Sequence, residues 1–223
     1  MFNWLTGNTV VRRTGRHLYE RIVAQSREPQ LYLRCGVPDT MDGRLEMILL
    51  HVVIVLDRLK AEGPRGQSVG QALMETLVAD MDDALRQIGL GDDSVAHRMP
   101  RLAGALTERS RDYGAAFDEL GPTPVIVGEA PRVDAPTVTA AGPLEAALLE
   151  HVYVPRDGEA MAAAVPFAMR LATYVRAARS QLATFDLRVI AGGDVAGGRV
   201  WPAVDVLAAE GADSALNQAE VRT

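Results

Sequence analysis

The feature that most constrains the fold is a nearly unbroken apolar run at residues 47–56, which contains a single polar residue, His51. Glu46 and Asp57 bracket this run. A bilayer crossing needs about 20 apolar residues, so the run is too short for a membrane anchor. Across residues 41–62 the apolar positions occupy every face of a helical wheel, and such a helix is buried by its neighbours. The pattern therefore predicts a central core helix in a soluble domain.

Helical signals continue along the chain, and no sustained strand pattern competes with them. Asp39 or Thr40 is placed to cap the central helix, and Gly63 follows its expected end. Ser68 and Gln71 have the spacing of a capping box. Apolar residues at helical spacing predict further helices over 14–28, 68–88, 94–118, 144–152 and 159–185. We expect Pro166 to interrupt its helix. Pro100 lies near the first turns of the helix over 94–118, where a proline costs little if the helix effectively begins there.

The fold class expected from these signals is all-α, a compact helical domain around one buried helix. Five prolines within residues 119–143 and the absence of a period there indicate a linker or an irregular arm. Trp201 follows a glycine-rich stretch that we expect to be a loop. The resulting division is a flexible N-terminus at 1–13, a helical core at 14–118, a Pro-rich linker at 119–143, a small helical extension packing on the core at 144–202, and a tail at 203–223.

Charge and cysteine content narrow the classes of partner. The formal net charge is -6, and only residues 1–34 are basic. This distribution argues against direct nucleic-acid binding. Cys35 is the only cysteine, which excludes an intramolecular disulfide and is typical of a reducing compartment. The N-terminal residues lack the order of a secretory signal, so we expect a cytoplasmic protein.

A few N-terminal side chains are compatible with weak peripheral contact at an anionic membrane. The apolar ones are Phe2, Trp4 and Leu5, and the basic ones are Arg12, Arg13 and Arg16. Apolar and basic residues together favour the interface of a bilayer. An ordinary frayed terminus explains the same composition.

No catalytic constellation or metal motif can be read from the residues. His51 has no ligating residue three or four positions away, so we expect no metal there. Asp39 and Asp42 form a possible carboxylate pair, but they lie where a helix start favours negative charge, and Arg44 is within reach of both. The acidic patch of Asp80, Asp82 and Asp83 is either a solvated face or, with Asp92 and Asp93, a surface for a basic partner.

Several linked segments resemble the ubiquinol-cytochrome c chaperone family. They are LYERIVAQSREPQLYLRCGVPDTMDGRLEMILLHVVIVLDRLKAEG and QALMETLVADMDDALRQIGLGDDSVAHRM, both within residues 18–118. LEAALLEHVYVPRDGE and LATYVRAARSQLATFD resemble the bacterial C-terminal extension of that family, with His151 where asparagine is usual. The matching motif positions are Gly36, Val37, Asp39, Thr40, Gly43, Arg44, His51, Asp80, Asp82, Leu85, Arg86, Gly89, Gly91, Asp92 and Ser94.

The resemblance implies a non-enzymatic assembly factor of respiratory complex III, with no cofactor, found in mitochondria and alphaproteobacteria. Its client would be newly made cytochrome b, a haem-bearing transmembrane subunit. It also raises a small helical partner and the ribosome as further partners, at the inner face of the cytoplasmic membrane. The candidate partner-binding residues are Asp39, Asp42, Arg44, His51, Asp80, Asp82, Arg86 and Asp92.

Two other classes of function stay open on the sequence. One is an all-α enzyme or small-ligand binder that uses a pocket lined by His51, Asp39, Asp42 and His17. The other is an adaptor that binds a partner helix and has no cytochrome client. An enclosed pocket where a carboxylate and a histidine converge would favour the enzyme, whereas an open groove with a solvated acidic rim would favour a chaperone.

Overall fold

The computed structural model describes residues 3–87, 92–121, 142–154, 157–192 and 199–204, with the side chains of 3–8 and 92–99 left out. All regular structure in these ranges is helical, which confirms the all-α prediction. The elements are α1 (Asn3–Ser26), α2 (Pro29–Leu33), α3 (Met41–Lys60), α4 (Gly63–Gln87), α5 (Asp92–Glu119), α6 (Pro143–Leu148), the π-helix η1 (Leu149–Tyr153), α7 (Gly158–Ala183) and α8 (Leu187–Gly192).

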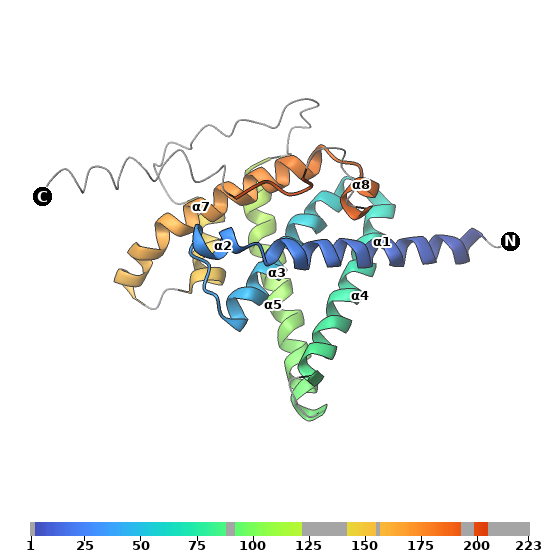
Figure 1. Ribbon diagram of the computed structural model, residues 1–223, viewed down its shortest axis with the longest axis horizontal. Helices are drawn as coiled ribbons and strands as arrows, with labels where there is room; N and C mark the ends of the chain where they lie inside the picture. Colours follow the sequence, from blue (N-terminus) through green and yellow to red (C-terminus); the bar gives the residue numbers. More distant parts are fainter. Residues whose placement is uncertain (1–2, 88–91, 122–141, 155–156, 193–198, 205–223) are drawn as a thin grey trace, which may run out of the picture.

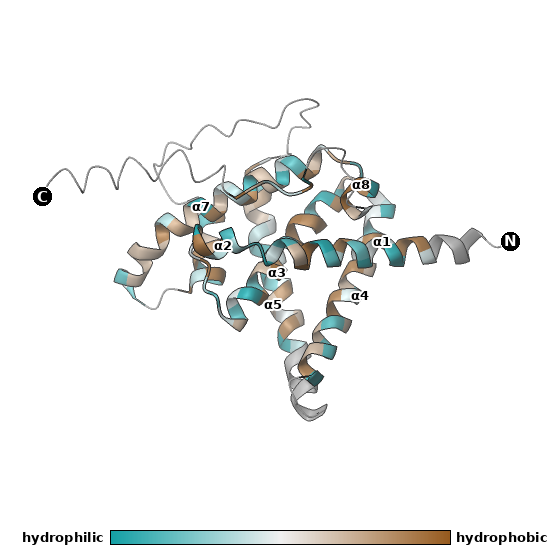
Figure 2. Cartoon of the chain, in the orientation of Figure 1, coloured by the Kyte–Doolittle hydropathy of each residue, from teal (hydrophilic) through white to brown (hydrophobic). Residues whose placement is uncertain are grey.

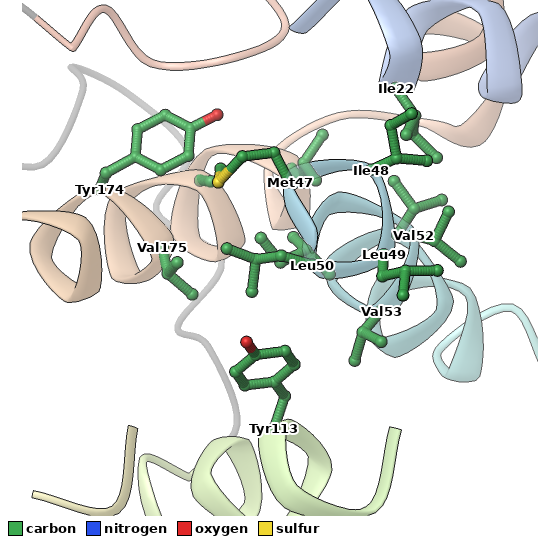
Figure 3. Packing of buried hydrophobic residues seen from close by; sticks show 14 of the residues in the cluster. Ile22, Met47, Ile48, Leu49, Leu50, Val52, Val53, Tyr113, Tyr174 and Val175 are labelled. Atoms are coloured by element: carbon green, nitrogen blue, oxygen red, sulfur yellow. The ribbon is translucent and has the colours of Figure 1, made fainter. Parts of the chain in front are cut away.

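The central helix α3 is the axis of the core, as its sequence predicts. Every residue from Met47 to Val55 is buried, and the helix contacts α1, α4, α5 and α7. Figure 3 shows how neighbouring helices enclose it, with Ile22 of α1, Tyr113 of α5 and Tyr174 of α7 facing its apolar side chains. No helix of the described residues is long and apolar enough to cross a membrane. The run at 47–56 is therefore a core segment.

The start of α3 is capped as expected, by the second of the two candidates. The backbone N–H of Gly43 donates to the hydroxyl oxygen of Thr40 at 3.1 Å. Asp42 lies in the first turn, where the helix dipole favours a negative charge. At the other end, Gly63 begins α4 at a φ of 59°, a left-handed conformation that glycine adopts without strain.

Two helix starts differ clearly from the prediction. The first helix begins at Asn3 instead of residue 14, and α4 begins at Gly63 instead of residue 68. The capping-box prediction is wrong, because the Ser68 hydroxyl donates to the Pro64 carbonyl oxygen within the helix. The sequence also missed two short helices: α2, where Pro29 starts a helix instead of only stopping one, and α8, in a region expected to be a loop.

Both internal prolines lie inside continuous helices. Pro100 is within α5, which begins at Asp92, and Pro166 is within α7. An interior proline removes one helical hydrogen bond and costs about 3 kcal/mol. In α7 the residues that follow Pro166 are largely buried, among them Ala168 and Leu171, and this burial offsets the cost. The predicted break at Pro166 is therefore wrong, whereas the helix predicted over 94–118 is confirmed and carries Pro100 in its interior.

The C-terminal helices contribute to the same hydrophobic cluster as α3. Trp201 is buried, which confirms the prediction that it packs against the rest of the protein. Polar contacts join α3 to α7: Arg58 donates to the carbonyl oxygens of Leu182 and Phe185, at 3.1 and 2.9 Å, and Arg179 pairs with Asp57. Arg58 thus adds a side-chain donor to two carbonyl groups at and just after the C-terminal end of α7.

The overall arrangement leaves two parts projecting from the body. Figure 1 shows the N-terminal part of α1 extending past α8, and α4 and α5 running down side by side to a tip. In Figure 2, hydrophilic residues recur along the outer part of α4, whereas hydrophobic colour gathers where the helices meet. The Pro-rich segment at 122–141 and the tail from 205 lie outside the described residues.

Candidate functional site

The turn between α2 and α3 has one side anchored in the protein. The Tyr153 hydroxyl of η1 donates to the Cys35 carbonyl oxygen at 2.6 Å. Gly36 has a φ of 61°, and a Cβ atom there would lie 2.5 Å from the ring of Phe167 on α7. Val37 is buried beside them. Glycine is therefore required at 36 both by conformation and by the close approach of Phe167.

The other side of the same turn faces solvent and carries charge. Arg44 donates to Asp39 at 2.6 Å, and their side chains are 61% and 58% exposed. This hydrogen bond lowers the pKa of Asp39 below its ordinary value. Asp42 is exposed as well and has its backbone in the first turn of α3. An exposed ion pair of this kind contributes little to stability.

Exposed apolar residues flank this ion pair along the chain. Leu33, at the end of α2, is 74% exposed, and Met41, at the start of α3, is 76% exposed. Single exposed apolar residues are ordinary, and these two lie at the ends of the two helices that the turn connects. We call Leu33, Asp39, Met41 and Arg44 the turn surface.

His51, the residue singled out inside the apolar run, is fully buried among polar partners from three helices. Its Nδ1 lies 2.7 Å from the Met47 carbonyl oxygen, and its Nε2 lies 2.7 Å from the Tyr174 hydroxyl. Gln25 of α1 donates to the same hydroxyl at 3.0 Å. Tyr174 therefore accepts from Gln25 and donates to Nε2, which leaves the proton of a neutral imidazole on Nδ1, facing Met47.

This environment keeps His51 uncharged. Burial lowers the pKa of His51 to about 4. The Trp201 ring packs edge-on against the imidazole, with ring centroids 5.1 Å apart. A buried imidazole whose two nitrogens are both satisfied links the elements that supply its partners. We infer that His51 holds α1, α3 and α7 together.

The candidate residues on α4 form a second, separate set of contacts. Asp80 accepts a hydrogen bond from the Tyr19 hydroxyl of α1 at 2.6 Å. Asp82 pairs with Arg86 one turn later, at 2.8 Å. Asp83 is exposed. Asp92 begins α5, and its side chain lies outside the described residues.

The four residues predicted to line an enzyme pocket take part in separate sets of contacts. Asp39 pairs with Arg44, whereas the partners of His51 are Met47, Tyr174 and Trp201. At 1.5 Å per residue, Asp42 and His51 are about 13 Å apart along α3. His17 is partly buried on α1, a different helix. The described contacts therefore do not bring these four residues into one site.

Sequence reasoning missed two polar contacts that join distant segments. Arg109 makes a two-pronged bond to Glu46, at 2.6 and 3.0 Å, and both side chains are largely buried. His151 of η1 lies 2.9 Å from Asp112 of α5. In the sequence Glu46 marks only the start of the apolar run, and no local spacing links it to Arg109. His151 stands out only because asparagine is usual at that position, and its partner Asp112 lies 39 positions earlier.

Comparison with known proteins shows which family the chain belongs to. A family model described as ubiquinol-cytochrome C chaperone matches residues 33–200, which is most of the chain. The chain belongs to the ubiquinol-cytochrome C chaperone family. It is also similar to the crystal structure of the Cbp3 homolog from Brucella abortus, with 30% identity, a TM-score of 0.64, and coverage of 90% of this chain and 93% of that one. No curated protein sequence matches it.

Proposed function

We propose that this protein is an assembly factor that binds newly made cytochrome b and supports the biogenesis of respiratory complex III. Membership of the ubiquinol-cytochrome C chaperone family supports a chaperone role in this pathway. The main support for client binding at the turn surface is its exposure: Leu33 and Met41 are exposed on either side, in the sequence, of the exposed Asp39–Arg44 pair.

A surface of this kind suits an apolar client that must later be released. Leu33 and Met41 gain free energy when an apolar segment covers them, because their surface leaves water. Asp39 and Arg44 at the rim add orientation and partner choice more than affinity. The anchoring of the opposite side through Cys35 and Gly36 keeps the turn in one conformation, which lowers the entropy cost of binding.

Charge reversal at Arg44 tests this placement. The Arg44→Glu variant sets a second carboxylate beside Asp39 and removes the cation from the rim, so we expect it to retain at most about a fifth of the cytochrome b that co-purifies with the wild type, a loss of about 1 kcal/mol of binding. The measurement is affinity purification of the tagged protein from solubilised cells, with cytochrome b detected by immunoblot.

Lys60→Glu is the matched control for that experiment. Lys60 is on the same helix, is 63% exposed against 61% for Arg44, and also pairs with an aspartate, Asp57. It lies at the opposite end of α3. We expect Lys60→Glu to retain the client. If folded Arg44→Glu protein co-purifies with as much cytochrome b as the wild type does, the turn surface is not the client contact.

The acidic part of α4 is the second proposed contact, for a small helical partner with basic residues. Asp82 and Asp83 lie on the projecting part of α4, and Asp80 is already engaged by Tyr19. Opposite charge steers association even where it adds little affinity. We propose that Arg86 of α4 and Asp92 of α5, the other two candidate residues, also contact this partner.

Weak contact with the inner face of the cytoplasmic membrane is a further part of the proposal. Arg12, Arg13 and Arg16 are exposed on α1, whose first part projects from the body. Basic residues near an anionic surface contribute about 1 kcal/mol each. Deleting residues 1–13 is expected to abolish flotation with vesicles that contain anionic lipid. Equal flotation of the truncated and full-length proteins would contradict this contact.

A further inference from the structure

Three side chains that can ligate a metal ion meet where α5 packs against the π-helix η1. Asp112 comes from α5, and Glu150 and His151 come from η1. Within the described part of the chain they form a group in which one ligand atom from each lies within 4.8 Å of the others. His151 Nε2 lies 2.9 Å from Asp112 Oδ2.

The histidine of this group is held in place before any ligand binds. His151 is 4% exposed, and the ring of Tyr113 packs edge-on against it with centroids 5.6 Å apart. Asp112 is partly buried, and Glu150 is exposed at the rim. A buried imidazole beside an exposed carboxylate, whose side chain has room to rotate, needs little rearrangement to surround a cation.

The backbone that presents Glu150 and His151 is itself unusual. The segment Leu149–Tyr153 is a π-helix, a form that is rare and occurs preferentially at functional sites. It ends at Val154, whose φ of 43° is a left-handed conformation that a β-branched residue rarely adopts. Val154 lies three residues after His151.

We propose that Asp112, Glu150 and His151 bind a divalent cation of the zinc class. One imidazole nitrogen and two carboxylate oxygens make a donor set that suits Zn²⁺, whereas Mg²⁺ and Ca²⁺ take oxygen ligands alone. Ligands of a tetrahedral zinc ion lie about 3.3 Å apart, which modest rotations of Asp112 and exposed Glu150 provide. Water, or a donor from a bound partner, completes the coordination.

The cation would connect α5 to η1, the element that also anchors the α2–α3 turn through Tyr153. Arg111 competes with it for Asp112: its guanidinium lies 2.8 Å from the carboxylate and its side chain is 73% exposed. An exposed arginine moves away at low cost, so it weakens metal binding without preventing it. Removing Arg111 is therefore expected to strengthen cation binding, whereas removing one of the three ligands weakens it.

Isothermal titration of chelator-treated, full-length protein with Zn²⁺ tests the site directly. We expect saturable binding of one equivalent and no comparable binding of Mg²⁺. Changes at outer-shell partners of a metal ligand already weaken binding by about 10–100-fold, so Glu150→Gln and His151→Gln should each weaken it by at least about tenfold. Arg111→Ala should tighten it. Glu150 is exposed, so its variant remains informative even if the His151 variant does not fold.

His17→Ala is the matched control, since it removes a histidine from a different helix and should leave zinc affinity unchanged. Zinc affinity that is the same in Glu150→Gln as in the wild type, or the absence of saturable binding, would overturn the proposal. The titration uses purified protein without client, so its outcome is independent of the role in complex III assembly.

Discussion

Replacing His51 with alanine is expected to lower the free energy of unfolding by about 3–5 kcal/mol, as for other large buried rings. The imidazole is fully buried and its removal leaves a cavity beside Trp201. It also leaves the Tyr174 hydroxyl without an acceptor, and an unsatisfied buried donor costs about 1–3 kcal/mol of that total. Urea denaturation followed by circular dichroism measures the loss.

Two further variants, Tyr174→Phe and His17→Ala, serve as comparisons for the His51→Ala measurement. Tyr174→Phe removes the other half of the hydrogen bond, and the double variant should lose less than the sum of the two single losses, because the residues act as a pair. His17→Ala, which changes a partly buried histidine on α1, should cost much less. A loss below 1 kcal/mol for His51→Ala would show that the core does not depend on this contact.

The buried imidazole also predicts how stability depends on pH. Burial lowers the pKa of His51 from its ordinary 6.5 to about 4, so between these values the unfolded chain binds a proton that the folded chain does not. The contribution is therefore complete above pH 6.5 and is lost as the pH falls towards 4, at up to about 1.4 kcal/mol per pH unit. The slope in this window should be smaller in His51→Ala. Parallel curves for the two proteins would contradict it.

Replacing Gly43 with alanine is the second change with a large expected effect. A Cβ atom at Gly43 would lie 2.0 Å from the Pro38 carbonyl oxygen, which is backbone and moves only with the whole turn. Overpacking costs about 1–3 kcal/mol, and the obstruction by backbone places this case at the upper end. The better helix propensity of alanine returns about 1 kcal/mol. The expected net loss is about 2 kcal/mol, together with displacement of the turn surface.

Gly104→Ala is the control for the glycine experiment. Gly104 is an exposed position inside α5, and a Cβ atom there meets nothing within 4 Å. Alanine should therefore stabilise the protein by about 0.5–1 kcal/mol at this site. Thermal unfolding of the two variants should move in opposite directions. A stabilised Gly43→Ala protein would show that the turn does not fold back on α3 as described.

The sequence predicts the central helix well because its signal is local. A run of apolar residues on all faces of a helix has one favourable outcome in water, which is burial by other helices. Boundaries set by tertiary packing were harder. Ser68 has the right spacing for a cap, yet the helix continues back to Gly63, and Pro166 has the right chemistry for a break, yet α7 runs through it. In both cases contacts with other helices outweigh a local preference.

The candidate site follows the same division. The pairing of Asp39 with Arg44 is local, and the sequence indicates it. The role of His51 depends on Tyr174, which lies 123 positions away, and the group at His151 depends on Asp112 of another helix. No spacing in one sequence reveals such pairs. The expected pairing of Arg44 with both aspartates is met for Asp39 in the described contacts.

The most direct test of the central claim is to delete the gene and measure assembled complex III in the membranes. Native gel electrophoresis and the reduced-minus-oxidised spectrum of cytochrome b report assembly and haem content together. We predict that the deletion strain loses most assembled complex III and its cytochrome b signal, and that the wild-type protein restores both whereas Arg44→Glu does not. Unchanged complex III in the deletion strain would contradict the proposed function.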